Sequence, residues 1–157
     1  MTTVSAARAQ ARRLMDENGL YNWRLVFDNH RTSAGRCDYD VRTISLSRPV
    51  LEVNPLEEVI DTILHEIAHA LVGADAGHGR IWRKQFLALG GSGRVTQDPR
   101  TVTIPPGKYI ATCSTCGTVH QRYRKTPGMA ERTLFCRFCS TPNDYVTGRL
   151  IWVARTS

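Results

Sequence analysis

The spacing of apolar and polar residues along this chain predicts both helices and short strands. Helical periodicity marks three segments, residues 4–18, 55–72 and 79–89. Runs typical of β-strands are shorter and fall at residues 22–28, 35–47, 108–113, 117–125, 132–136 and 149–154. The segment 35–47 is long enough for two strands, with Ile44 and Leu46 on one face of the second. We therefore expect an α+β fold: helices packed on a small sheet, then a small β-rich module.

The helix expected at residues 55–72 has the clearest boundaries. Asn54 can cap its N-terminus, Pro55 suits the first helical position, and Gly73 ends it. An apolar stripe runs along one side and comprises Ile60, Ile63, Leu64, Ile67, Ala70 and Leu71. His65 and His69 fall nearly opposite this stripe. We therefore expect the histidine-bearing face not to be needed for core packing.

The segment His65-Glu-Ile-Ala-His69 has the spacing of a metal site. Histidines one helical turn apart can both reach one ion. Glu66 lies about 100° around the helix from His65, so it can reach a water held by the ion rather than the ion itself. Zinc hydrolysis needs this set of groups: protein ligands, an open position and a carboxylate that accepts a proton. The alternative, a helix that merely carries two histidines, is disfavoured because the motif falls on a well-bounded helix.

A third ligand has to come from outside this helix. His78 is the preferred candidate, because Gly77 and Gly79 on either side let the backbone turn back toward the helix. Asp75 is the competing candidate, since carboxylates also bind zinc.

Four of the five cysteines form two C-x-x-C pairs separated by 19 residues: Cys113, Cys116, Cys136 and Cys139. This spacing is typical of a structural zinc site with four thiolates. His120 could replace one thiolate, and two redox pairs are the alternative interpretation. A module of about 50 residues buries little core, so zinc would supply much of its folding energy. The fifth cysteine, Cys37, is expected to be a small buried hydrophobe.

Positive charge is unevenly distributed. Residues 1–90 contain 11 Lys+Arg and 11 Asp+Glu, whereas residues 91–157 contain 10 and 3, which accounts for the whole net charge of +7. With four thiolates and Zn²⁺ adding −2, about +5 remains in this half. The asymmetry favours contact with nucleic acid over a basic surface that only aids solubility. The expected nucleic-acid contacts are Arg122, Arg124, Lys125, Arg132 and Arg137.

Aromatic residues are interleaved with these basic ones: Tyr109, Tyr123, Phe135, Phe138 and Trp152. Basic grooves with aromatic faces suit single strands, because bases stack on the rings. The alternative is that some of the rings, Phe135 and Trp152 first, form the core of the module. The pattern does not separate single-strand from duplex binding.

Glycines at 90–93 and the proline-containing segment that follows predict a boundary, with a core over residues 1–105 and a cysteine module over 106–157. No apolar run reaches the roughly 20 residues that span a bilayer. The N-terminus lacks the apolar stretch of a signal peptide. We expect a cytoplasmic protein, nucleoid-associated if prokaryotic, that has no membrane contact and is a monomer.

The stretch from Arg31 to Phe86 resembles the protease core of the SprT/Spartan metalloproteases, through "AGRC", "ISLSRPVL", "HEIAH" and "GHGRIW". The cysteine module is similar to the zinc ribbon of bacterial SprT-like proteins. The resemblance implies a zincin-like core with one catalytic Zn²⁺ on His65, His69 and His78. It also implies that Glu66 is the catalytic acid/base and that a second Zn²⁺ is structural.

The resemblance further implies a zinc metalloendopeptidase that acts on DNA-bound or DNA-crosslinked proteins. Two alternatives stay open. One is a nucleic-acid-binding zinc protein whose protease core is silent. The other is a peptidase indifferent to DNA, whose ribbon serves stability or protein contacts.

Overall fold

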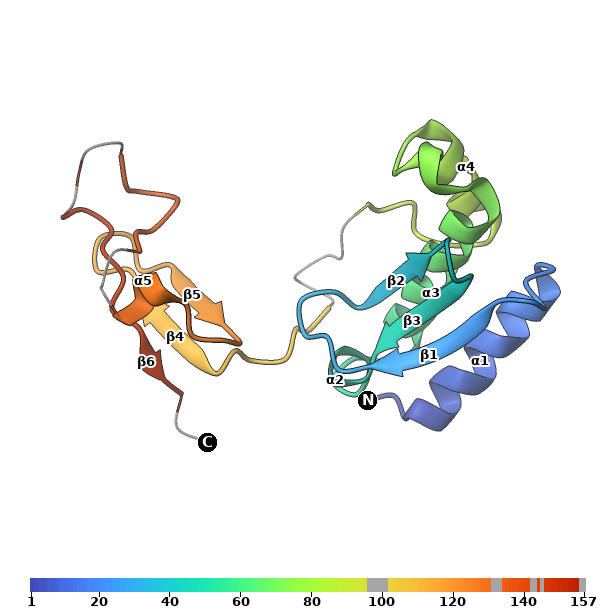
Figure 1. Ribbon diagram of the computed structural model, residues 1–157, viewed down its shortest axis with the longest axis horizontal. Helices are drawn as coiled ribbons and strands as arrows, with labels where there is room; N and C mark the ends of the chain where they lie inside the picture. The colour runs from blue at the N-terminus through green and yellow to red at the C-terminus, as the bar shows by residue number, and fades with distance from the viewer. Residues whose placement is uncertain (96–101, 131–133, 142–143, 145, 156–157) are drawn as a thin grey trace. The chain divides into compact units, whose positions relative to one another are not determined.

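The computed structural model describes residues 1–95, 102–130, 134–141, 144 and 146–155. The chain divides into two compact units, Met1–Pro105 and Pro106–Ser157, and each is described by itself (Figure 1). Within the described residues, none of the helices combines the length and the apolar character that crossing a bilayer requires.

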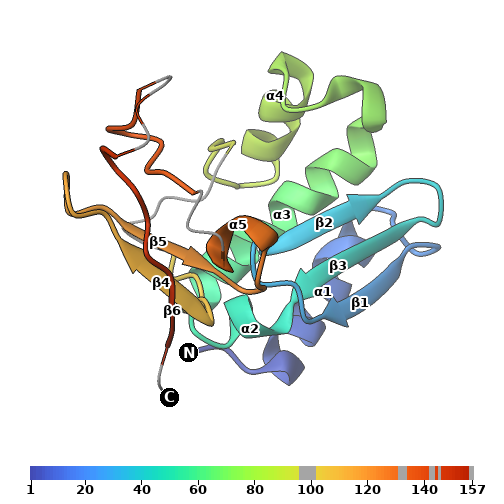
Figure 2. The ribbon, with the colours of Figure 1, turned by 60° about the vertical axis from the view of Figure 1, so that its left-hand side comes forward.

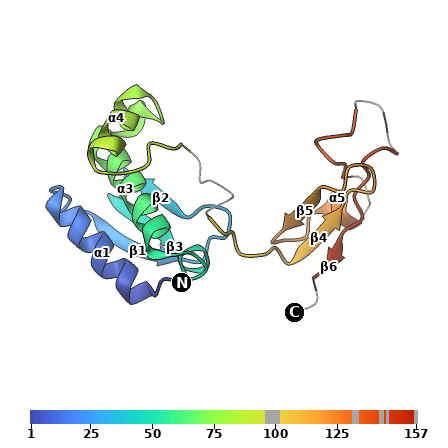
Figure 3. The same cartoon turned by 180° about the vertical axis from the view of Figure 1, so that it is seen from behind.

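The first unit is built on a three-stranded sheet of β1 (Arg24–Asp28), β2 (Gly35–Asp38) and β3 (Thr43–Ser47), in the order β1-β3-β2. β3 runs parallel to β1 and antiparallel to β2, so residues 35–47 form the two strands that the sequence predicts. Helices α1 (Val4–Glu17) and α3 (Leu56–Val72) cover the same face of this sheet (Figure 3). β2 is left as an edge strand beside α3.

The main core lies between these two helices and the sheet. In α1, Ala7, Ala11 and Met15 recur every four residues and are fully buried, as an amphipathic helix requires. From β3, Ile44 and Leu46 point into the same core, which confirms the expected face of that strand.

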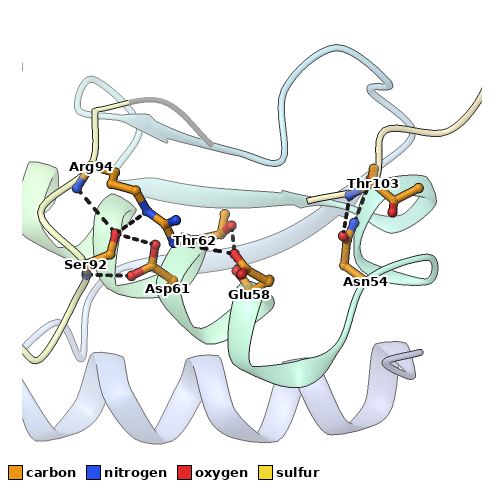
Figure 4. A network of polar contacts seen from close by, with 7 residues as sticks. All are labelled: Asn54, Glu58, Asp61, Thr62, Ser92, Arg94 and Thr103. Atoms are coloured by element: carbon orange, nitrogen blue, oxygen red, sulfur yellow. Dashed lines mark hydrogen bonds and ion pairs between the residues drawn. The ribbon is translucent and has the colours of Figure 1, made fainter. Parts of the chain in front are cut away.

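The predicted capping role of Asn54 is wrong. Pro55 occupies the N-cap of α3, without a side-chain cap bond. The Asn54 amide instead donates to the carbonyls of Val50, at 2.6 Å, and Thr103, at 2.7 Å. Its Oδ1 accepts from the N–H of Thr103 at 2.7 Å (Figure 4). The carbonyl of Val50 belongs to a short helix α2 (Arg48–Leu51), which the sequence pattern does not predict, and Thr103 lies 49 residues further along the chain.

The histidine-bearing side of α3 is packed, contrary to expectation. Helix α4 (Arg80–Ala88) lies against it after a 3₁₀ turn at Ala74–Ala76, and buries Trp82 and Phe86 completely. Leu71, which helical periodicity places in the apolar stripe, is 39% exposed. The sequence pattern predicts one buried face, but α4 forms a second core with Leu64 and Ala68 of the helix, which extends burial toward the histidines.

The second unit contains an antiparallel sheet in the order β5-β4-β6 (Figure 2). Its strands are β4 (Tyr109–Thr112), β5 (Val119–Arg122) and the two-residue β6 (Val153–Ala154), with a single turn of helix α5 at Pro127–Ala130. The strand expected at 132–136 lies partly outside the described residues, and Phe135 forms an isolated bridge with Arg149. Of the strand expected at 149–154, β6 covers the last two residues. The mixed α+β architecture is confirmed.

Candidate active site and metal centres

Three histidines from two parts of the first unit converge. The Nε2 atom of His78 lies 3.1 Å from that of His65 and 3.0 Å from that of His69. A tetrahedral zinc ion with bonds of about 2.0–2.1 Å holds its nitrogen ligands about 3.3 Å apart. The three imidazoles therefore fit one such ion.

The return of the chain after α3 brings His78 to this point. Gly73 has φ 86° and Gly77 has φ 46°, both in the left-handed region that favours glycine. These two bends fold the 3₁₀ turn back along the helix. Asp75, the competing candidate ligand, is exposed on that turn and lies outside the histidine cluster.

Trp82 contacts all three imidazoles, a role that the sequence pattern does not indicate. Its ring centroid lies 4.7 Å from those of His65 and His78, and it stacks on His69 at 5.2 Å. Its Nε1–H points to the backbone carbonyl of His65 at 3.4 Å. A fully buried, rigid ring at this position limits how far the three imidazoles can rotate.

The electrostatics of the site favour metal binding. Burial, with repulsion from the neighbouring imidazoles, lowers the pKa of both His65 and His69 to about 4. Both rings are therefore neutral near pH 7, and a neutral imidazole is the form that binds metal.

Glu66 is the one buried acidic side chain among the described residues, with 6% exposure. Burial raises its pKa to about 8, against a smaller opposing effect of Arg36. Cys37 lies nearby on β2. Burial first, and then the charge of Glu66, raise the pKa of the Cys37 thiol to about 12. Cys37 is half-buried, so the expectation of a buried hydrophobe holds only in part.

Glu66 and His65 line a cleft of about 330 Å³. One side is formed by residues 32–35, which lead into β2, and the other by Arg94 and Val95. The second side is tied to α3 through Asp61, whose carboxylate accepts from Ser92 N–H at 2.7 Å and from Ser92 Oγ at 2.9 Å (Figure 4).

Arg94 continues this attachment. Its Nε donates to Ser92 Oγ at 3.2 Å, and its guanidinium lies 3.9 Å from the carboxylate of Glu58. Sequence reasoning missed Asp61, Ser92 and Arg94. Asp61 and Ser92 are 31 residues apart, and no local pattern connects them.

The second cluster consists of the four predicted cysteines. The Sγ atoms of Cys113 and Cys139 lie 3.4 Å apart, and those of Cys116 and Cys136 lie 3.6 Å apart. Tetrahedral zinc with bonds of about 2.3 Å separates its sulfurs by about 3.8 Å. The four thiols therefore fit a zinc ion as well.

Hydrogen bonds around the first cysteine pair lower the pKa of both thiols and favour thiolates there, whereas burial raises the pKa of Cys139. Bonding to Thr118 lowers the pKa of Cys116 to about 6. His120 is adjacent, with Nε2 3.3 Å from the Sγ of Cys136, where it can hydrogen-bond to a thiolate. The four cysteines form the complete group without it.

A groove of about 420 Å³ lies beside this cluster. Two arginines stand over aromatic rings on its surface, Arg122 at 5.5 Å from Trp152 and Arg137 at 4.7 Å from Phe138. Phe138 is 64% exposed. Of the other predicted nucleic-acid contacts, Arg124 and Lys125 are exposed outside the groove lining, and Arg132 lies outside the described residues.

Two clusters of convergent ligands, one in each unit of the chain, define a candidate metalloprotein. The chain belongs to the SprT-like family, whose model matches residues 5–102, more than half of the sequence. Among curated proteins, none matches the chain in sequence.

Two solved structures are similar in part. One is the metallopeptidase zymogen abylysin of Pyrococcus abyssi, at 20% identity and a TM-score of 0.44, covering 51% of this chain and 75% of that one. The other is a Mycobacterium tuberculosis transcriptional regulator, at 13% identity and a TM-score of 0.31, covering 92% of this chain and 71% of that one. At TM-scores below 0.5, neither similarity establishes a shared fold.

Proposed function

We propose that this protein is a zinc-dependent endopeptidase that acts on proteins bound or crosslinked to DNA. The observation that supports the peptidase half of the proposal is the convergence of three imidazoles, next to a cleft that His65 and the buried Glu66 line. Membership of the SprT-like family is consistent with it.

His65, His69 and His78 would hold the catalytic zinc. Bound there, zinc supplies a Lewis acid that polarises the scissile carbonyl and makes water nucleophilic near neutral pH. Glu66 accepts a proton from the attacking water and delivers it to the leaving amine, and a pKa of about 8 suits a group that must do both. The cleft admits an extended chain between β2 and the Arg94 side.

The second unit supports the DNA half of the proposal. Pro106–Ser157 contains 8 Lys+Arg against 2 Asp+Glu. In its groove, Phe138 offers an exposed ring for base stacking, while Arg122 and Arg137 can pair with phosphates. This arrangement favours single-stranded over double-stranded DNA, because bases must be unpaired to stack on a side chain.

The decisive experiment is a cleavage assay on a DNA-bound protein substrate. Wild type and Glu66→Gln are compared without DNA, with single-stranded DNA and with duplex DNA. We expect cleavage by the wild type, stimulated most by single strands, and none by Glu66→Gln. No cleavage under any condition would instead support a silent protease core. Cleavage unaffected by DNA would support a DNA-independent peptidase.

A binding experiment tests the groove separately. Phe138→Ala should weaken binding to a single strand about tenfold or more, because it removes a stacking surface. Arg137→Gln should reduce the salt dependence by about one phosphate contact. Arg155→Gln is the matched control, since it removes the same charge at an exposed position outside the groove lining. Equal losses for Arg137→Gln and Arg155→Gln would refute a specific role for the groove.

A further inference from the structure

We propose that Gly35 is a positioning residue for Glu66, an inference that rests on the proposed peptidase function. Gly35 begins β2, the edge strand that lies against α3. It pairs with Leu46, while Cys37 pairs with Ile44. Leu46 and Ile44 are buried under the helices, so Gly35 and Cys37 occupy the helix-facing positions of β2.

The carboxylate of Glu66 occupies the space that a side chain at position 35 would fill. A Cβ atom on Gly35 would lie 2.8 Å from Oε1 and 2.9 Å from Cγ of Glu66. It would also lie 3.0 Å from Cγ2 of Thr62. Carbon atoms in favourable contact are about 3.5–4.0 Å apart, so Glu66 would have to move by at least about 0.6 Å.

Backbone conformation does not explain this glycine. Gly35 lies in a regular strand and is not among the glycines with positive φ, so alanine would suit its backbone. What the position requires is the absence of a side chain. The contacted atoms belong to the side chains of Glu66 and Thr62 rather than to the backbone, and the two closest are on Glu66, so the chain can relieve most of the overlap by displacing Glu66.

Displacing Glu66 should affect turnover more than folding. Glu66 is buried against β2 with its carboxylate facing the cleft that His65 also lines. A misplacement on the order of 1 Å can cost about 100-fold in rate. We expect Gly35→Ala to lower kcat about 10–100-fold, with metal content within about twofold of wild type.

A stability cycle on metal-free protein provides a readout that does not depend on activity. The melting temperatures of wild type, Gly35→Ala, Glu66→Ala and the double variant are compared. Gly35→Ala should lower Tm when residue 66 is glutamate, and should leave it unchanged or raise it when residue 66 is alanine. Repeating the cycle in a Thr62→Ser background measures how much of the change in Tm comes from the contact with the Thr62 methyl group.

The outcomes separate this inference from the proposed function. If Gly35→Ala lowered Tm equally in wild type and in the Glu66→Ala variant, the inference would be overturned. A Gly35→Ala enzyme with wild-type kcat would overturn it as well. If no variant, wild type included, cleaves any substrate, the peptidase proposal fails. The cycle would still decide whether Gly35 and Glu66 are coupled.

Discussion

Replacing Glu66 by glutamine should make the metal-free protein more stable, and increasingly so as pH rises. Burial raises the pKa of Glu66 from its ordinary value of 4.5 to about 8. Between these two pH values the folded protein therefore keeps a proton on Glu66, whereas the unfolded chain releases it. Unfolding is favoured as pH rises, and stability is lost between about pH 4.5 and the folded-state pKa. A glutamine side chain does not titrate, so the variant escapes this loss.

The magnitude follows from the same shift. A rise from 4.5 to about 8, at about 1.4 kcal/mol for each pKa unit, gives a ceiling of about 5 kcal/mol above pH 8. His65 and His69 have lowered pKa values, so the stability that they contribute is lost as pH falls below their ordinary pKa of 6.5, the opposite of the Glu66 effect. Both histidines are present in wild type and variant, and their effect cancels in the difference.

Urea titrations of chelator-treated wild type and Glu66→Gln provide the measurement. Far-UV circular dichroism is the appropriate signal, because the long helices α1 and α3 both belong to the first unit. We expect the difference in unfolding free energy to grow by several kcal/mol from about pH 5 to about pH 9. A difference that stays constant over this interval would refute the reasoning that Glu66 is buried and proton-bound without metal.

Three further outcomes follow from the core and the metal sites. Asn54→Ala removes three hydrogen bonds, one buried and two partly buried, and should cost about 2–4 kcal/mol in the same titration; unchanged stability would contradict the bonds to Val50 and Thr103. Elemental analysis should find about two zinc ions per wild-type chain and one in His65→Ala, and retention of both would contradict the histidine site. Trp82→Leu should weaken zinc binding at the histidine site about tenfold or more while the cysteine site keeps its ion, since the imidazoles lose a packing surface and the thiols do not.

Local patterns in the sequence determined much of this protein. The spacing of His65, Glu66 and His69 sets their angles around one helix, and Gly77 beside His78 marks the return of the chain. Each C-x-x-C pair likewise places its own two sulfurs on one turn. Within the helix and within each pair, a few bonds between neighbouring residues fix the geometry, so periodicity and spacing are enough to predict it.

The tertiary structure alone decided how those groups are supported. Helical periodicity predicted no packing partner for the histidine side of α3, yet Trp82 from α4 covers it. Gly35 and Glu66 are 31 residues apart, and their contact depends on how an edge strand lies on a helix. Asn54 satisfied a backbone segment far along the chain instead of the helix that follows it. Such contacts depend on which residues the folded chain brings within contact distance of a group, and sequence periodicity contains no information about residues far apart in the chain.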